Sequence, residues 1–391
     1  MRRVLWLIPM MLVSFGLSML LVNPAPASAI GEVTPTPEPA PETEEAPTIP
    51  DDVDIDALVD EALLDVQSGN FSGAVEKMDI VLAVEDVMQA YLIRGVARTQ
   101  LGQTNEAIDD FSQAIELEPW QFDLYIFRGD AYFNNGDLSN ALLDYDQAID
   151  INLFSVEAYQ RRANVNYNLG DTTAGDVDDL IARAIIASSE NDTSTTFAFL
   201  DEAIATGEGM QSIGTAYYIR AITNMNNGDT SAAFADYGDA LEADPDLHNI
   251  YLARGILYRE QDNIKAAGVD FYNRITLHGQ ETVNESMAIG ETLEIQMAYR
   301  RVVEISFEGE AGQVITISAD DFSGTVVDPL ISLLNPDGEP IAGDDDFGGV
   351  LNSLIDDFEL PVDGTYTLLV SHAEGGYNFG FNGIIEVEIS E

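Results

Sequence analysis

One pattern occurs at residues 91–119 as YLIRGVARTQLGQTNEAIDDFSQAIELEP and returns 34 residues later, at 125–153, as YIFRGDAYFNNGDLSNALLDYDQAIDINL. The same frame appears at 217–245 and 251–275, and weaker copies begin at Leu58 and Tyr159. Apolar residues follow the period of an α-helix, and residues 51–280 contain two prolines, Pro119 and Pro245. This pattern predicts pairs of helices joined by short turns.

A repeat with this length and these aromatic, small and proline positions resembles the tetratricopeptide repeat. The resemblance implies a helical solenoid of about six repeats over residues 51–280. It also implies a concave groove, lined by the first helix of each repeat, that holds extended peptides or partner helices. Residues 172–213 depart from the frame, either as one irregular repeat with an inserted helix or as two degraded repeats.

Arginine and aspartate recur at two fixed places in the frame, sixteen residues apart. Because buried arginine is normally paired, this spacing predicts a structural ion pair between the first and second helices of each repeat. The alternative, a stripe of arginines for an anionic ligand, is disfavoured because each arginine has its own matched acid. The predicted pairs are Arg94 with Asp110, Arg128 with Asp144, Arg220 with Asp236, and Arg254 with Asp270.

The fifth, ninth and thirteenth positions of the frame are expected to face the groove. Asparagine recurs at the thirteenth position, and its amide can both donate to and accept from a peptide backbone. Alternatively, these asparagines lie at the solvated end of the first helix, since asparagine is a poor mid-helix residue. The candidate partner-binding residues are Ile126, Asn134, Asn164, Asn168, Tyr218, Ile222 and Asn226.

Residues 281–391 have a different composition, with more glycine and alternating β-branched residues. Short segments such as VVEISF and TYTLLVS, separated by turns, predict a β-sandwich. Asp328-Pro329, Asn335-Pro336-Asp337-Gly338 and Asp363-Gly364-Thr365-Tyr366 resemble the bacterial pre-peptidase C-terminal domain, a jelly-roll-like module. The resemblance implies a domain attached to secreted peptidases and also to non-enzymatic surface proteins. The expected fold class is therefore multidomain, an all-α helical-repeat solenoid followed by an all-β jelly-roll-like sandwich.

The same segment contains a candidate calcium site. Calcium takes six to eight oxygen ligands, usually including several carboxylates. Acidic loops are also expected by chance in a chain of this charge, so both interpretations stay open. The candidate ligands are Asp328, Asp344, Asp345 and Asp346, and no other cofactor is expected.

The charge of the chain restricts its partners. Its 391 residues include 16 Lys and Arg against 69 Asp and Glu, a net charge of −53. This field repels phosphate backbones, which excludes nucleic acid, and favours a neutral or basic protein or peptide partner. The chain has no cysteine and three histidines, and no nucleophile–base motif can be assembled, so we expect it not to be an enzyme.

The N-terminus predicts export. Met1-Arg2-Arg3, an apolar run and Ala27-Ser28-Ala29 are typical of a signal peptide over residues 1–29. The alternative is an uncleaved anchor, which would be the only contact of the chain with a membrane. Residues 30–50 hold six prolines and five glutamates and predict an extended linker. The expected location is secreted or cell-surface.

These features together predict an exported, non-enzymatic scaffold whose repeats bind a peptide or protein partner. The sandwich would then serve secretion or surface attachment. Two alternatives are an accessory subunit of a secreted peptidase and a polysaccharide-binding surface protein. For the last of these, exposed aromatic residues such as Tyr377 and Phe379 would be expected on one face of the sandwich.

Overall fold

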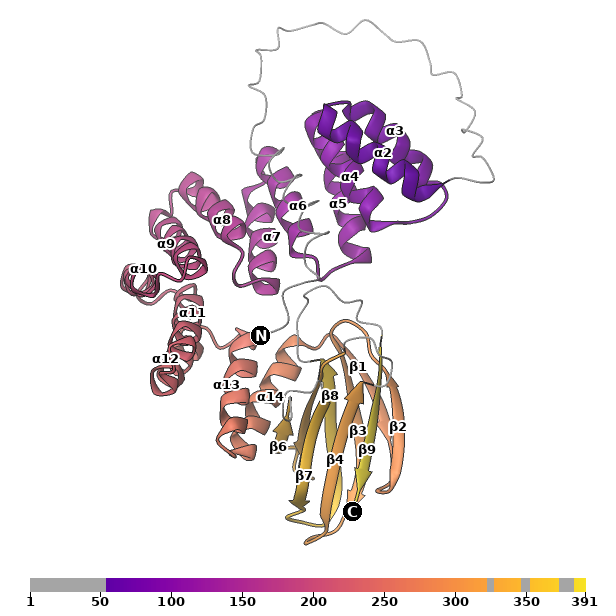
Figure 1. Ribbon diagram of the computed structural model, residues 1–391, viewed down its shortest axis with the longest axis vertical. Coiled ribbons are helices and arrows are strands. Elements are labelled where there is room, and N and C mark those ends of the chain that lie inside the picture. The colour runs from indigo at the N-terminus through magenta and orange to yellow at the C-terminus, as the bar shows by residue number, and fades with distance from the viewer. Residues whose placement is uncertain (1–53, 322–326, 346–351, 373–382) are drawn as a thin grey trace, which may run out of the picture. The chain divides into compact units, whose positions relative to one another are not determined.

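The computed structural model describes residues 54–321, 327–345, 352–372 and 383–391. Within these ranges, thirteen helices precede nine strands in two sheets (Figure 1), which confirms the expected fold class. The expected signal peptide and linker, and also Asp346, Tyr377 and Phe379, lie outside the described residues. None of the described helices combines the length and the apolar character needed to cross a bilayer. The chain divides into two units, residues 1–169 and 170–391, and each is described by itself.

The described part of the first unit consists of successive helices, each packed against the next. Their shared core includes Phe111 and Phe127, whose rings stack at 5.9 Å between centroids. The helices are α2 (Ile55–Ser68), α3 (Phe71–Leu82), α4 (Met88–Gln100), α5 (Thr104–Leu117), α6 (Phe122–Asn134), α7 (Leu138–Ile151) and α8 (Val156–Leu169).

The turn inside a repeat is built from a glycine followed by an aspartate. Gly136 has φ +78°, a left-handed conformation that allows the chain to reverse after α6. Asp137 then caps α7, because its side chain accepts a hydrogen bond from the backbone N–H of Asn140 at 3.2 Å. Gly228 and Asp229 repeat this arrangement before α12 (Thr230–Ala243). These two repeats therefore contain their own helix stop and helix start.

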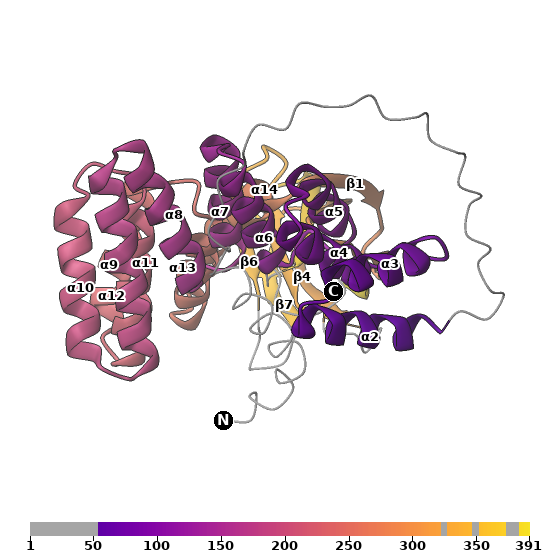
Figure 2. The ribbon, with the colours of Figure 1, turned by 90° about the horizontal axis from the view of Figure 1, so that it is seen from above.

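The second unit begins with α9 (Thr172–Ser189) and α10 (Thr193–Thr206), which pack against each other. Figure 2 shows them beside α11 (Ile213–Asn226) and α12. The frame that begins at Tyr159 next returns at Tyr217, 58 residues later and so 24 residues beyond one repeat length. This length contains α9 and α10, so the irregular segment holds one further helix pair. The last pair is α13 (His248–Glu260) and α14 (Ile264–His278).

Two sheets follow, with a common core between them that includes Ile305, Phe307, Ile317 and Val387. One sheet has the order β1-β3-β8-β5-β6 and the other β2-β9-β4-β7. The β1–β3 pair is parallel and the other strand pairs are antiparallel. The strands are β1 (Glu281–Ser286), β2 (Glu291–Gln296), β3 (Arg301–Gly309), β4 (Val314–Asp321), β5 (Pro329–Leu334), β6 (Pro340–Asp344), β7 (Asn352–Glu359), β8 (Gly364–His372) and β9 (Ile384–Ser390).

The last helix of the repeats packs directly on the first of these sheets. Phe271 and Ile275 of α14 share a buried cluster with Leu330, Leu334 and Leu369 of the sheet. The contact is close at Gly268, whose carbonyl accepts a hydrogen bond from the Ser332 hydroxyl at 3.0 Å. Helix α14 therefore belongs to the hydrophobic core on the outer side of the sheet, as well as to the repeats.

This close contact predicts that a single methyl group at residue 268 destabilises the second unit. A Cβ atom built on Gly268 would lie 2.5 Å from the carbonyl carbon of Ala342, a backbone atom of β6. We expect Gly268→Ala to lower the free energy of opening of α14 by about 1–3 kcal/mol, because strand and helix must separate. Native-state hydrogen exchange of the α14 amides measures this quantity.

Gly238 in α12 provides the matched control. It is also a helical glycine, but a Cβ built there meets nothing within 4 Å. Gly238→Ala should therefore stabilise its helix by roughly 0.5–1 kcal/mol through propensity alone. Equal effects of the two substitutions would contradict a steric origin.

Candidate functional site

Each predicted arginine–aspartate pair is formed, and each joins the two helices of one repeat. The nitrogen–oxygen distance is 2.7 Å in three of the pairs and 2.5 Å in the pair of Arg220 and Asp236. The aspartates are buried, and two guanidinium nitrogens of Arg128 donate to the two oxygens of Asp144. Charge-assisted bonds of this bidentate kind fix both the distance and the orientation of the two helices.

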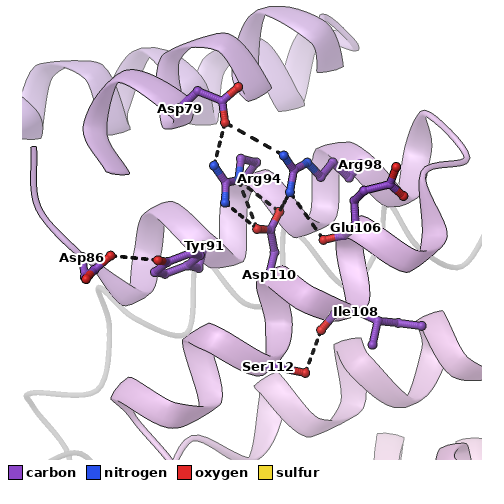
Figure 3. A network of polar contacts seen from close by, with 9 residues as sticks. All are labelled: Asp79, Asp86, Tyr91, Arg94, Arg98, Glu106, Ile108, Asp110 and Ser112. Atoms are coloured by element: carbon purple, nitrogen blue, oxygen red, sulfur yellow. Dashed lines mark hydrogen bonds and ion pairs between the residues drawn. The ribbon is translucent and has the colours of Figure 1, made fainter. Parts of the chain in front are cut away.

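Two of these arginines also pair with an aspartate on the second helix of the preceding repeat. Arg94 lies 2.6 Å from Asp79 of α3, and Figure 3 shows it between Asp79 and Asp110, with Arg98 beside it. Arg220 lies 2.8 Å from Asp201 of α10 in the same way. One guanidinium group thus connects three helices, which couples neighbouring repeats.

An aromatic ring completes the arginine site. A tyrosine three residues before each arginine places its ring under the guanidinium group, at distances from 5.1 Å for Arg220 over Tyr217 to 5.9 Å for Arg254 over Tyr251. Burial raises the pKa of Asp270, and the hydrogen bonds and charge of Arg254 oppose this rise. The arrangement is a satisfied internal network, so these arginines are not available as an anion-binding stripe.

The predicted groove residues divide into two groups. Asn134, Asn164, Asn168 and Asn226 are exposed and Ile222 is half-buried. Ile126 and Tyr218 are only 2% and 9% exposed, so the prediction that they line an open groove is wrong. Both pack inside the helical layers, because the adjacent elements cover a position that the frame alone places on the surface.

The exposed asparagines lie near the ends of the first helices. Asn134 and Asn226 are the last residues of α6 and α11. The amide of Asn168 donates to the backbone carbonyl of Asn164 at 2.7 Å, one turn back in α8. These side chains present amide groups to solvent at one end of the helices rather than along the whole groove.

The ninth position of the frame in α6 holds a buried carboxylate. Asp130 of α6 accepts a hydrogen bond from the Tyr145 hydroxyl at 2.7 Å and lies 3.0 Å from Arg161 of α8. Burial raises the pKa of Asp130 to about 6, although Arg161 and Tyr145 oppose the rise. Asp130 and Arg161 join the first helices of two successive repeats, and the sixteen-residue spacing gives no signal for this pair.

One of the candidate calcium ligands, Asp344, is paired with an arginine. Asp344 is fully buried, one of its oxygens lies 2.5 Å from Nε of Arg259 in α13, and the other accepts from the Leu354 backbone N–H. Asp328 and Asp345 are also buried. Among the described residues, no group of three or more His, Asp or Glu is arranged to hold a metal ion, and Asp346 is not one of them. Calcium binding stays a prediction.

The pairs inside the repeats should be energetically coupled. In a double-mutant cycle, we expect Arg128→Ala and Asp144→Ala to show a coupling energy of about 2 kcal/mol, since removing one partner leaves the other buried and unpaired. Urea unfolding followed by the fluorescence of Trp120, in the same unit, measures it. A cycle on the half-buried Lys77 and the exposed Glu61, 4.0 Å apart, should give less than about 0.5 kcal/mol. Independent effects of the Arg128 and Asp144 substitutions would show that the pair is incidental.

Asp130 should make the first unit less stable as the pH rises. Its folded pKa of about 6 lies above the ordinary value of 3.8, so the folded chain takes up a proton between these values. The free energy of unfolding should therefore fall between about pH 4 and 6, by at most about 3 kcal/mol for a shift of this size. Asp130→Asn should flatten this dependence, again measured through Trp120. Asp109→Asn, at an exposed position of α5, should leave it unchanged.

Comparison with known proteins agrees with the repeat architecture. A family model described as TPR repeat matches residues 95–136, and models described as tetratricopeptide repeat match residues 122–153 and 219–280. No protein with a curated description matches the chain.

Several solved structures are similar to parts of the chain. MamA protein is 19% identical over 48% of this chain and 91% of its own, with a TM-score of 0.29. A tetratricopeptide repeat protein from Parabacteroides merdae is 18% identical over 57% of this chain and 93% of its own, with a TM-score of 0.31. The pre-peptidase C-terminal domain of collagenase from Bacillus anthracis is 16% identical over 28% of this chain and 98% of its own, with a TM-score of 0.23.

Because these TM-scores are low, the repeats are assigned to a family from the family models alone. Their matched residues contain three of the four arginine–aspartate pairs complete, together with Asp110 of the fourth. The chain thus contains tetratricopeptide repeats, matched over residues 95–153 and 219–280, and a β-sandwich follows the last of them.

Proposed function

We propose that the chain is a non-enzymatic scaffold whose repeats bind an extended segment of a partner protein. Tetratricopeptide repeats are generally interaction modules, which supports this function over catalysis. The observation that carries the proposal is the division of roles within the first helices. Arginine and tyrosine are used inside the repeat, whereas Asn134, Asn164 and Asn168 stay exposed.

The exposed side chains favour a peptide backbone as the ligand. Gln160, Asn164 and Asn168 lie on α8 and are all exposed, and Asn134 ends α6 in the same unit. Amide groups can pair with both the N–H and the C=O of an extended chain, which a row of carboxylates cannot do. With a net charge of −53, the partner segment is expected to be neutral or basic.

A selection with random linear peptides tests this function. The full chain without residues 1–29 selects peptides from a displayed library, and fluorescence polarisation then measures the dissociation constants of the enriched sequences. We expect neutral or basic peptides whose affinity falls about tenfold in the variant Asn134→Ala, Asn164→Ala, Asn168→Ala, through lost hydrogen bonds. A control variant, Asn105→Ala with Asn140→Ala, changes exposed asparagines on the second helices and should bind normally. Failure to enrich any peptide, or equal binding by both variants, would contradict the proposed site.

The proposed location is outside the cytoplasm, with residues 1–29 removed as a signal peptide. The basic start and Ala27-Ser28-Ala29 support this proposal. N-terminal sequencing of the chain from its native source should then begin at Ile30. A chain that begins at Met1 or Arg2 would indicate an anchor or a non-exported protein.

A further inference from the structure

Two of the three histidines of the chain, 30 residues apart in sequence, come together in the second unit. His248 begins α13 and His278 ends α14, so the fold of this helix pair brings them together. Their ring centroids are 4.5 Å apart, and the residues are only 6% and 8% exposed. His372, at the end of β8, lies within electrostatic range of His278.

Positive groups surround this histidine pair on several elements. Arg274 lies one turn before His278 in α14 and is 1% exposed. Arg300 faces His278 from the turn Ala298–Arg301 before β3, and the ring of Tyr299 in this turn lies edge-on to it at 6.1 Å. Among the described residues, the titratable and charged groups that act on His278 include His248 of α13, Arg274 of α14, Tyr299 and Arg300 of the turn, and His372 of β8.

The cluster lies where the repeats join the sandwich. The backbone N–H of Gln280, two residues after His278, donates to the carbonyl of Arg300 at 2.8 Å. Arg300 holds a left-handed conformation with φ 55°, which is unfavourable for a side chain with a Cβ atom and is maintained only by its surroundings. On the other side, Arg274 interacts with Tyr218 of α11 in the preceding repeat. The packing of these side chains thus connects the preceding repeat, the last helix pair and the start of the sheet.

We propose that His248 and His278 form an acid-sensitive joint, which is closed at neutral pH and releases the last helix pair from the turn Ala298–Arg301 on acidification. The two rings are buried, in van der Waals contact and close to two arginines. Protonation of either ring would therefore place a desolvated positive charge beside other positive groups, which is unfavourable. Opening at this place separates the end of α14 from the turn, which the backbone hydrogen bond from Gln280 to Arg300 otherwise connects.

The direction of the effect follows from where the proton binds. In the closed joint, burial lowers the pKa of His278 far below its ordinary value, and the charges of Arg274, His248, Arg300 and His372 lower it further. In an open joint, the ring would titrate near its ordinary value of about 6.5. The open form therefore binds a proton that the closed form does not, so the closed form is favoured above this pH and loses stability below it. At about pH 5, His278 alone shifts the equilibrium about 30-fold toward opening.

Histidine-selective NMR and hydrogen exchange on the full chain test this joint together. With isotope-labelled histidine, the chain gives three imidazole signal sets, and His372→Gln assigns one of them. We expect the His278 ring to stay neutral through about pH 6.5 and then to change together with a fall in α14 protection. Corrected for intrinsic exchange rates, this protection should fall at least about 30-fold between about pH 7.5 and 5. Helices α9 and α10 of the same unit contain no histidine and should keep their protection.

The variant His278→Phe separates protonation from packing, because it retains a ring against His248 and Tyr299. It should keep most of the α14 protection at about pH 5. An unchanged fall in this variant, or an equal fall in α9 and α10, would overturn the proposal. So would a His278 ring that titrates near 6.5 while α14 stays protected. If the variant does not fold at neutral pH, the titration of the unmodified chain decides alone.

Discussion

The architecture of the repeats depends on a buried ion pair between arginine and aspartate. In a chain with 69 acidic and 16 basic side chains, cations are scarce, and the repeats place them inside. Arg94 connects α4 to α5 through Asp110 and to α3 through Asp79, so one side chain sets the relation of three helices. The surface keeps the excess of carboxylates, which favours solubility and repels other acidic macromolecules.

A buried pair of this kind contributes more to the specificity of packing than to net stability. Desolvation of both groups offsets much of their attraction, so apolar residues of similar volume could replace them at little cost. Apolar residues, however, would not fix the relative orientation of the two helices. The guanidinium group of Arg128 meets the carboxylate of Asp144 in one orientation, and Gly129 beside it leaves room for the ring of Tyr145, which a Cβ would approach to 2.7 Å. The pair and the glycine together allow one register of the two helices.

The repeats were predictable because their determining contacts are short in sequence. A spacing of sixteen residues recurs visibly at four places along the repeats. Burial was harder to predict. Ile126 and Tyr218 occupy groove positions of the frame, but neighbouring elements cover them, and a frame position contains no information about its neighbours. The surroundings of the candidate calcium ligand Asp344 were equally hard to predict, because the arginine that pairs with it lies 85 residues earlier in the sequence.

The contact between α14 and the sheet covers surfaces that each part would expose if it stood alone. A helical array must cover the apolar face of its last helix, usually with a polar capping element. A sheet must protect its edge strands from pairing with other chains. Here β6 is the edge strand, and α14 packs against it at Gly343, where a Cβ would lie 2.8 Å from the Cα atom of Gly268. The sandwich therefore caps the array, and α14 covers part of the outer face of the sheet beside this edge strand, so residue 280 separates two compositions within one compact unit.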